Sequence, residues 1–125
     1  MWQKHILMAA AGAAGTLARY GLGGLVQRAA GEAYPWGTLA VNVAGCFLFG
    51  LVWEMGEERL LISGEARLIV LVGFMGAFTT FSTFAFETGE MLRSAQYLAA
   101  AGNLVAQNLA SVGALLVGLA AGRAL

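Results

Sequence analysis

The stretch that decides the fold is GFMGAFTTFSTF, residues 73–84, at the centre of the uncharged segment 68–86. An apolar segment of about 20 residues is long enough to cross the hydrocarbon core of a bilayer as a helix. The centre of this one carries glycine, threonine and serine. These residues weaken helices because glycine is flexible and hydroxyl groups can bond to their own backbone carbonyls. We therefore predict a transmembrane helix that is broken at its centre, where the backbone is buried in protein or lines a watery cavity.

The composition of the 125-residue chain also indicates a membrane protein. Hydrophobic residues make up 59% of it and charged residues only 11%, with a mean hydropathy of +0.74. A soluble protein needs polar residues over most of its surface, whereas a lipid-facing surface needs none. The net charge of zero argues against a nucleic-acid partner. No nucleophile–base pair or metal-ligand spacing accompanies Cys46 or His5, so we do not expect an enzyme.

Charged residues divide the chain into four apolar segments. Residues 33–53 and 94–122 are uncharged and long enough to span a bilayer. The first segment of the chain is apolar except for Arg19. We therefore predict an all-α membrane protein, a single domain of residues 1–125, with four transmembrane helices. These boundaries place the helices at about residues 4–27, 35–54, 66–91 and 97–123.

The orientation of the chain in the membrane is weakly specified by its charges. With four spans, one side of the membrane carries Lys4, Arg59, Arg67 and Arg123, and the other carries Arg28 and Arg93. This bias is small by the positive-inside rule, so it leaves open a single orientation or insertion both ways up. Two copies in opposite orientations would form an inverted-repeat homodimer, a design that many transporters encode within one chain. Glycines in every span favour close packing of such helices.

A charged residue, Arg19, and an amide residue, Asn42, lie inside the first two spans. Arg19 carries a charge whose burial in hydrocarbon costs free energy, so it either snorkels to an interface or faces a water-filled mouth that attracts anions. Asn42 needs a hydrogen-bond partner in the membrane. It either joins helices or lines a pore, where its amide can donate to an anion. The residues alone leave both alternatives open.

The fourth span carries three polar residues at helical spacing. Asn103, Gln107 and Ser111 follow one another at intervals of four, which places them on one stripe of the helix, while Asn108 falls off it. Such a stripe is typical either of a hydrated track or of polar contacts between helices.

The quoted stretch also contains a pair of aromatic residues. Phe81 and Phe84 are three positions apart and project from a common helical face. Such a pair usually packs against other apolar groups. The alternative uses the electropositive edge of the ring, which can solvate a small dehydrated anion without a formal charge.

Together these residues resemble the Fluc family of fluoride channels, also called CrcB proteins. Three blocks carry the resemblance: GTLARY at residues 15–20, PWGTLAVNVAGCFLFG at residues 35–50, and GFMGAFTTFSTF at residues 73–84, followed by Glu87. The third block is highly specific, and the resemblance covers nearly the whole chain.

The resemblance implies an antiparallel, dual-topology homodimer in the inner (plasma) membrane, with two fluoride pathways at the subunit interface. It implies that the backbone carbonyls of Gly76 and Thr79 from each subunit surround a central structural sodium ion. Phe81 and Phe84 would offer their ring edges to the permeating fluoride ion.

The resemblance also implies roles for the polar residues. Asn42, Ser82 and Thr83 would donate hydrogen bonds beside the rings, and Arg19 would face an aqueous vestibule. The family commonly has tyrosine, serine or threonine in the polar track of the fourth helix. This chain has Asn103, Gln107 and Ser111 at the corresponding positions, so it departs from that pattern.

The prediction that results is a passive, fluoride-selective channel that exports fluoride from the cytoplasm. Neutral donors suit this function because they replace lost water and still release the ion. One alternative is a small proton-coupled multidrug exporter, which needs a carboxylate in its first span, where this chain has none. The other is a non-conducting membrane assembly subunit, in which the polar residues only join helices.

Overall fold

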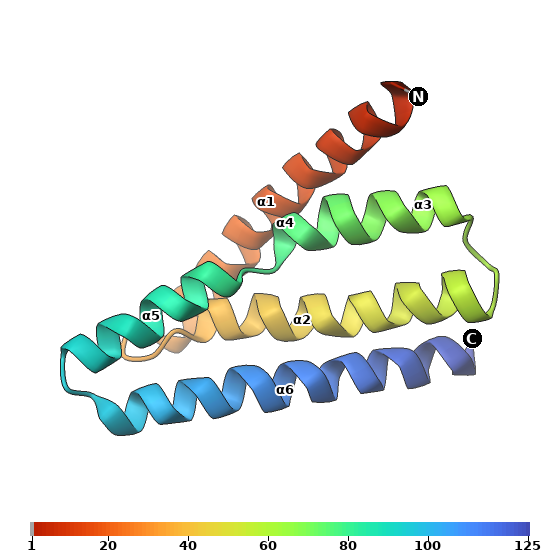
Figure 1. Ribbon diagram of the computed structural model, residues 1–125. Coiled ribbons are helices and arrows are strands. Elements are labelled where there is room, and N and C mark those ends of the chain that lie inside the picture. The colour runs from red at the N-terminus through yellow and green to blue at the C-terminus, as the bar shows by residue number, and fades with distance from the viewer. Residues whose placement is uncertain (1) are drawn as a thin grey trace.

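The computed structural model describes residues 2–125, and within that range the chain is helical and has no strands (Figure 1). The longest helices are α1 (Trp2–Ala30), α2 (Trp36–Trp53) and α6 (Tyr97–Ala124). The shorter segments are η1 (Glu54–Glu58), α3 (Gly64–Leu68), η2 (Ile69–Met75), α4 (Gly76–Phe78) and α5 (Phe81–Arg93). The η segments are π-helical: η1 continues α2, and η2 joins α3 to α4 without interruption. The prediction of an all-α chain is confirmed.

Three helical runs of the described residues are long and apolar enough to cross a membrane: Trp36–Glu58, Gly64–Arg93 and Tyr97–Ala124. The chain is therefore a multi-pass membrane protein. Helix α1 has 29 residues, which is sufficient length for a fourth span, but its three basic residues make it less apolar. The membrane crossing of α1 remains a prediction.

The second of these runs is broken at Thr79 and Thr80. Both residues are extended, with φ −86° and ψ 160° at Thr79 and φ −150° and ψ 113° at Thr80. Helix α5 begins directly afterwards, and the Thr80 hydroxyl caps it by accepting a hydrogen bond of 3.1 Å from Thr83 N–H. Such a cap satisfies one of the N–H groups that a helix start leaves free. The predicted break is confirmed and is visible in Figure 1 between α4 and α5.

Helices α2 and α6 run side by side in the same direction and form the most extensive helix pair (Figure 1). Glycine makes this approach possible. A Cβ atom on Gly118 would run into the carbonyl oxygen of Phe47, and one on Gly50 would run into that of Leu115. Close contact of this kind stabilises helix pairs in lipid, where the hydrophobic effect contributes little.

Helix α1 packs against the run that precedes the break. Gly15 allows this contact, since a Cβ atom there would collide with the carbonyl oxygen of Phe74. The buried core lies beside it and consists of Val41, Leu71, Met75 and Phe78. The residues before the break are thus held between α1 and α2.

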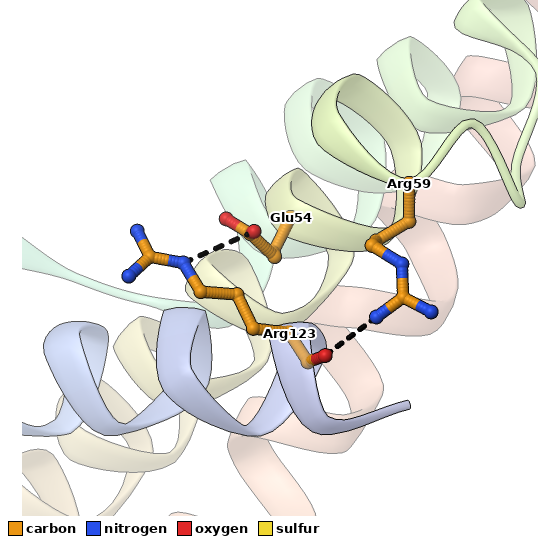
Figure 2. A network of polar contacts seen from close by, with 3 residues as sticks. All are labelled: Glu54, Arg59 and Arg123. Atoms are coloured by element: carbon orange, nitrogen blue, oxygen red, sulfur yellow. Dashed lines mark hydrogen bonds and ion pairs between the residues drawn. The ribbon is translucent and has the colours of Figure 1, made fainter.

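Charged residues join the ends of α2 and α6 (Figure 2). Glu54 is only 4% exposed, and its carboxylate accepts a hydrogen bond of 3.2 Å from Arg123 Nε. Arg59 Nη1 donates to the carbonyl oxygen of Arg123 at 2.5 Å (Figure 2). We call Glu54, Arg59 and Arg123 the charged cluster. It fastens the C-terminal end of α6 to the π-helical extension of α2.

Candidate functional site

Asn42 of α2 holds the extended residues of the break. Its Oδ1 accepts a hydrogen bond of 2.8 Å from Thr80 N–H, and its Nδ2 donates to the Thr80 carbonyl at 3.1 Å. In an unbroken helix, Thr80 N–H would instead donate to the carbonyl of Gly76, four residues earlier. The side chain of Asn42 therefore replaces a helical hydrogen bond at membrane depth, where an unpaired backbone group would be costly.

Gln107 of α6 extends this contact. Its Oε1 accepts a second hydrogen bond from Asn42 Nδ2, at 3.0 Å. Gln107 is 4% exposed, and its Nε2 atom has no hydrogen-bond partner within residues 2–125. We call Asn42, Thr80 and Gln107 the amide network. It joins α2, the break and α6 without any formal charge.

A cavity of about 350 Å³ adjoins the amide network. Helices α2 and α6 and both sides of the break contribute to its wall, and no lining residue is charged. Seven predicted site residues line it: Asn42, Gly76, Thr79, Phe81, Phe84, Gln107 and Ser111. The structure thus brings together most of the predicted pathway and both predicted sodium ligands. A neutral wall of this kind can solvate an ion through dipoles and N–H groups.

The two phenylalanine rings of the cavity meet edge to face. Their centroids are 5.4 Å apart and their planes make an angle of 73°. Phe84 is buried, at 6% exposure, whereas Phe81 is 77% exposed. Phe84 therefore has a fixed place within the chain, while Phe81 presents most of its ring to whatever lies beside the protein.

A second cavity, of about 470 Å³, contains Arg19, Thr83 and Glu87 in its wall. Thr80 lines both cavities, so the break adjoins each of them. The ion pairs recorded within residues 2–125 do not include Arg19. Arg19 thus shares a cavity with the acidic residue Glu87, and its place in an aqueous vestibule remains a prediction.

The two remaining predicted residues lie away from these cavities. Ser82 is exposed and lines neither of them. Asn103 is fully buried and bonds to protein groups: its Nδ2 donates to Thr88 Oγ1 at 2.9 Å, and its Oδ1 accepts from the Tyr34 hydroxyl at 3.1 Å. Asn103 thus joins α6 to α5 and to the loop before α2. A place on an ion pathway remains a prediction for both residues.

Tyr34 lies outside the membrane-spanning helices, in the loop between α1 and α2. Burial raises the pKa of its hydroxyl, and the negative charge of Glu87 adds to the effect. Both causes favour the protonated hydroxyl, which is the form that donates to Asn103.

Three residues of this region were not predicted from the sequence: Thr80, Glu87 and Tyr34. Thr80 carries a detectable signal, because a threonine directly before a helix is a typical N-cap. Glu87 follows the GFMGAFTTFSTF block and lies within α5, which continues to Arg93, but no local signal predicts its place in a cavity wall. Tyr34 has no local signal, since its partner Asn103 is 69 positions away in the sequence.

The chemistry of the break fits the predicted sodium ligands. No group of three or more His, Cys, Asp and Glu side chains that could hold a metal ion occurs within residues 2–125. Carbonyl oxygens of an unwound helix are a different kind of donor, suited to alkali cations. The Gly76 carbonyl has lost Thr80 N–H as its helical partner, and Thr79 lies in the extended segment. The sodium ion itself remains a prediction.

The chain is similar in sequence to known proteins over most of its length. A family model described as "CrcB-like protein, Camphor Resistance (CrcB)" matches residues 6–119. The chain is 62% identical over 108 residues to the protein named fluoride-specific ion channel FluC from Nitrosococcus oceani, with 86% of each chain covered. Proteins of the same name from Solidesulfovibrio magneticus and Desulforapulum autotrophicum are 58% and 50% identical over 123 residues, with 98% of each chain covered.

Proposed function

The chain belongs to the CrcB-like family, and from this membership we propose that it is a passive, fluoride-selective ion channel. The observation that carries the proposal is the uncharged cavity at the helix break, lined by amide, hydroxyl and phenyl groups. Relatives that match the chain over nearly their full lengths are named fluoride-specific ion channels, and this supports the choice of ion. The family is one of channels rather than enzymes.

Fluoride is small and strongly hydrated, so its passage requires groups that replace its water without holding it too tightly. A lysine or arginine in a narrow, low-dielectric passage would bind the anion strongly, because Coulomb attraction increases as the dielectric constant falls. The cavity has no such group. Donors such as Ser111, with the amide of Gln107, supply weaker and exchangeable contacts.

The phenyl pair has a specific part in this proposal. The edges of Phe81 and Phe84 carry partial positive charge, while their faces carry partial negative charge. An anion that passes along an edge is therefore stabilised without a formal positive charge. The edge-to-face contact fixes the relative orientation of the two rings, so Phe84 determines which edge Phe81 can offer.

We further propose that two copies form an antiparallel homodimer with a pathway on each side of the interface. Phe81 supports this, because it lines the cavity and yet is 77% exposed in the single chain. A second copy would cover it and close the cavity. The small charge bias between the two ends permits both orientations in one membrane. The carbonyls of Gly76 and Thr79 from both copies would hold the sodium ion, whose positive charge would draw the two breaks together.

Because the proposed channel is passive, the electrochemical gradient of fluoride sets the direction of transport. A channel in the inner membrane lets fluoride leave the cytoplasm down its electrochemical gradient, without an energy source. The proton-coupled multidrug exporter is disfavoured by α1, which has no carboxylate. The non-conducting assembly subunit predicts the same hydrogen bonds between helices but no flux.

The test is ion efflux from liposomes that contain the purified protein. Fluoride efflux with negligible chloride efflux is expected. A well-folded protein that passes no fluoride would contradict the proposal and leave the assembly subunit as the alternative. Efflux of a cationic dye driven by a proton gradient would identify an exporter instead.

A further inference from the structure

The two amide side chains of the amide network, Asn42 and Gln107, differ in how their hydrogen bonds are used. Family resemblance implies that Asn42 donates its amide to the anion, but the hydrogen bonds of Asn42 are already used. Its Oδ1 accepts from Thr80 N–H, and the two protons of Nδ2 go to the Thr80 carbonyl and to Gln107 Oε1. An amide nitrogen has only two protons, so Asn42 has none left for an anion.

The chemistry of the backbone fixes the orientation of both amides. Thr80 N–H can only donate and the Thr80 carbonyl can only accept, so Asn42 must place Oδ1 toward the first and Nδ2 toward the second. Asn42 Nδ2 then requires an acceptor, which is Gln107 Oε1 at 3.0 Å. A reversed Gln107 amide would bring two NH2 groups together. The backbone at Thr80 therefore determines, through Asn42, that Gln107 Nε2 is the atom left over.

Gln107 Nε2 is an unusual group in a membrane helix. It is buried, it carries two protons, and it has no partner within residues 2–125. A buried donor without a partner is destabilising, and natural proteins keep few of them. Gln107 lines the 350 Å³ cavity together with Ser111 and the phenyl pair. A ligand that accepts hydrogen bonds would satisfy this donor.

We propose that Gln107 Nε2 is the amide donor to a small, hard monoanion in this chain, and that Asn42 is a positioning residue that orients Gln107 and holds the break. This inference rests on the proposed function, because it identifies the donor at the same cavity. It assigns to Gln107 the amide contact that the resemblance assigns to Asn42. Gln107 gives direct contact to the ion, and Asn42 acts through Gln107 and Thr80.

Nuclear magnetic resonance of the whole protein in detergent micelles tests the assignment directly. Side chains of glutamine and asparagine are labelled with 15N, and the Gln107 signal is identified by its loss in Gln107→Met. Sodium fluoride should shift the Gln107 NH2 signals, and sodium chloride should leave them unchanged. The Asn42 signals should move less than those of Gln107. Shifts confined to Asn42, or no shift at Gln107 in a protein that conducts fluoride, would overturn the proposal.

Flux measurements with substituted proteins provide the second test. Gln107→Met keeps the length of the side chain and removes the donor, so fluoride efflux should fall about tenfold or more, as expected for a hydrogen bond to a charged group. Gln107→Glu keeps an acceptor for Asn42 but lacks the N–H groups, so it should lose efflux as well. Leu109→Met is the matched control, because Leu109 is exposed on the same helix and lines neither cavity of the candidate site. Its efflux should equal that of the wild type.

The outcomes separate this inference from the proposed function. If the wild type conducts fluoride and folded Gln107→Met conducts it equally well, the Gln107 assignment fails and the channel stands. If the wild type does not conduct, the channel fails, and the fluoride titration of the Gln107 signals still decides whether an anion site exists.

Discussion

Helices α2 and α6 are joined by polar side chains at two places, and the two junctions differ in charge and in completeness. At the helix ends, the charged cluster joins Glu54 to Arg123, whose side chain is 70% exposed. Near the middle, the amide network joins Asn42 to Gln107 without a formal charge. The charged cluster pairs its buried carboxylate. The amide network leaves one buried donor without a partner.

The difference shows where a membrane protein can use charge. An ion pair at a helix end retains contact with water, so its desolvation cost is limited. An unpaired charge in the middle of the membrane would be far more costly and would also retain an anion. The chain therefore fastens its ends with charge and surrounds its cavity with neutral groups. We infer that the charged cluster supports the fold and that the amide network serves the ion.

The largest effect on stability is expected from Gly118→Val, because this change disrupts the close packing of α2 against α6 on which both junctions depend. The added side chain would force α2 and α6 apart at the Phe47 carbonyl. Overpacking of this kind should reduce the free energy of unfolding by about 3 kcal/mol or more. Unfolding in mixed detergent micelles, followed by circular dichroism, measures it. Gly113→Val on the same helix is the control, since no atom lies within 4 Å of a Cβ there. Equal stability of the two variants would refute the close-packing argument.

The second effect concerns the amide network itself. Asn42→Leu has a similar volume but leaves Thr80 N–H, the Thr80 carbonyl and Gln107 Oε1 without their partner. Three unsatisfied buried groups at about 1 kcal/mol each, the lower end of the usual range, predict a loss of about 3 kcal/mol in the free energy of unfolding, together with loss of fluoride efflux. The same unfolding and efflux assays apply. Full efflux in this variant would show that the network is not needed for conduction.

A smaller effect is expected at the charged cluster. Glu54→Gln retains an acceptor for Arg123 but loses the charge, which should reduce the free energy of unfolding by about 1 kcal/mol. Fluoride efflux per reconstituted protein should not change, because Glu54 lines neither cavity of the candidate site. A tenfold fall in efflux with an intact fold would remove the functional distinction between the two junctions.

The smallest effect on stability is expected from Tyr34, and it should appear at high pH. The pKa of Tyr34 is raised above its ordinary value of 10.0, so the unfolded chain loses this proton before the folded one does. The contribution of Tyr34 to stability is therefore complete below about pH 10 and is lost as the pH rises through the folded-state pKa. Tyr34→Phe should remove this alkaline dependence, which should be small because Tyr34 is only partly buried and solvent screens the charge of Glu87. The free energy of unfolding of both proteins, measured from about pH 9 to about pH 11, checks this. Parallel curves for the two proteins would contradict the shift.

Local chemistry predicted the break and the polar face of α6 well. Glycine and threonine content located the interruption that the structure places at Thr79 and Thr80. The spacing of Asn103 and Gln107 predicted a common face, and both residues are buried there, while Asn108 is exposed. Helical periodicity reports which side a residue faces, and that information is local.

Hydrogen-bond partners across helices could not be predicted in the same way. Asn42 and Gln107 are 65 positions apart, and their contact depends on how closely α2 and α6 approach. For Asn103, the alternatives of hydrated track and helix contact were both open, and the structure shows bonds to Tyr34 and Thr88. Glu87 was noted only as the residue that follows the GFMGAFTTFSTF block, because the sequence does not show which cavity a residue near the end of an apolar segment faces.

The measurement that tests the central claim most directly is efflux of fluoride and of chloride from liposomes that contain either the wild type or Phe84→Ile. Isoleucine keeps much of the apolar volume and removes the ring edge. We predict that the wild type passes fluoride and excludes chloride, and that the folded variant passes neither ion. Absence of fluoride efflux in the wild type, or equal fluoride efflux in Phe84→Ile, would contradict the proposal that fluoride crosses the membrane along this neutral cavity.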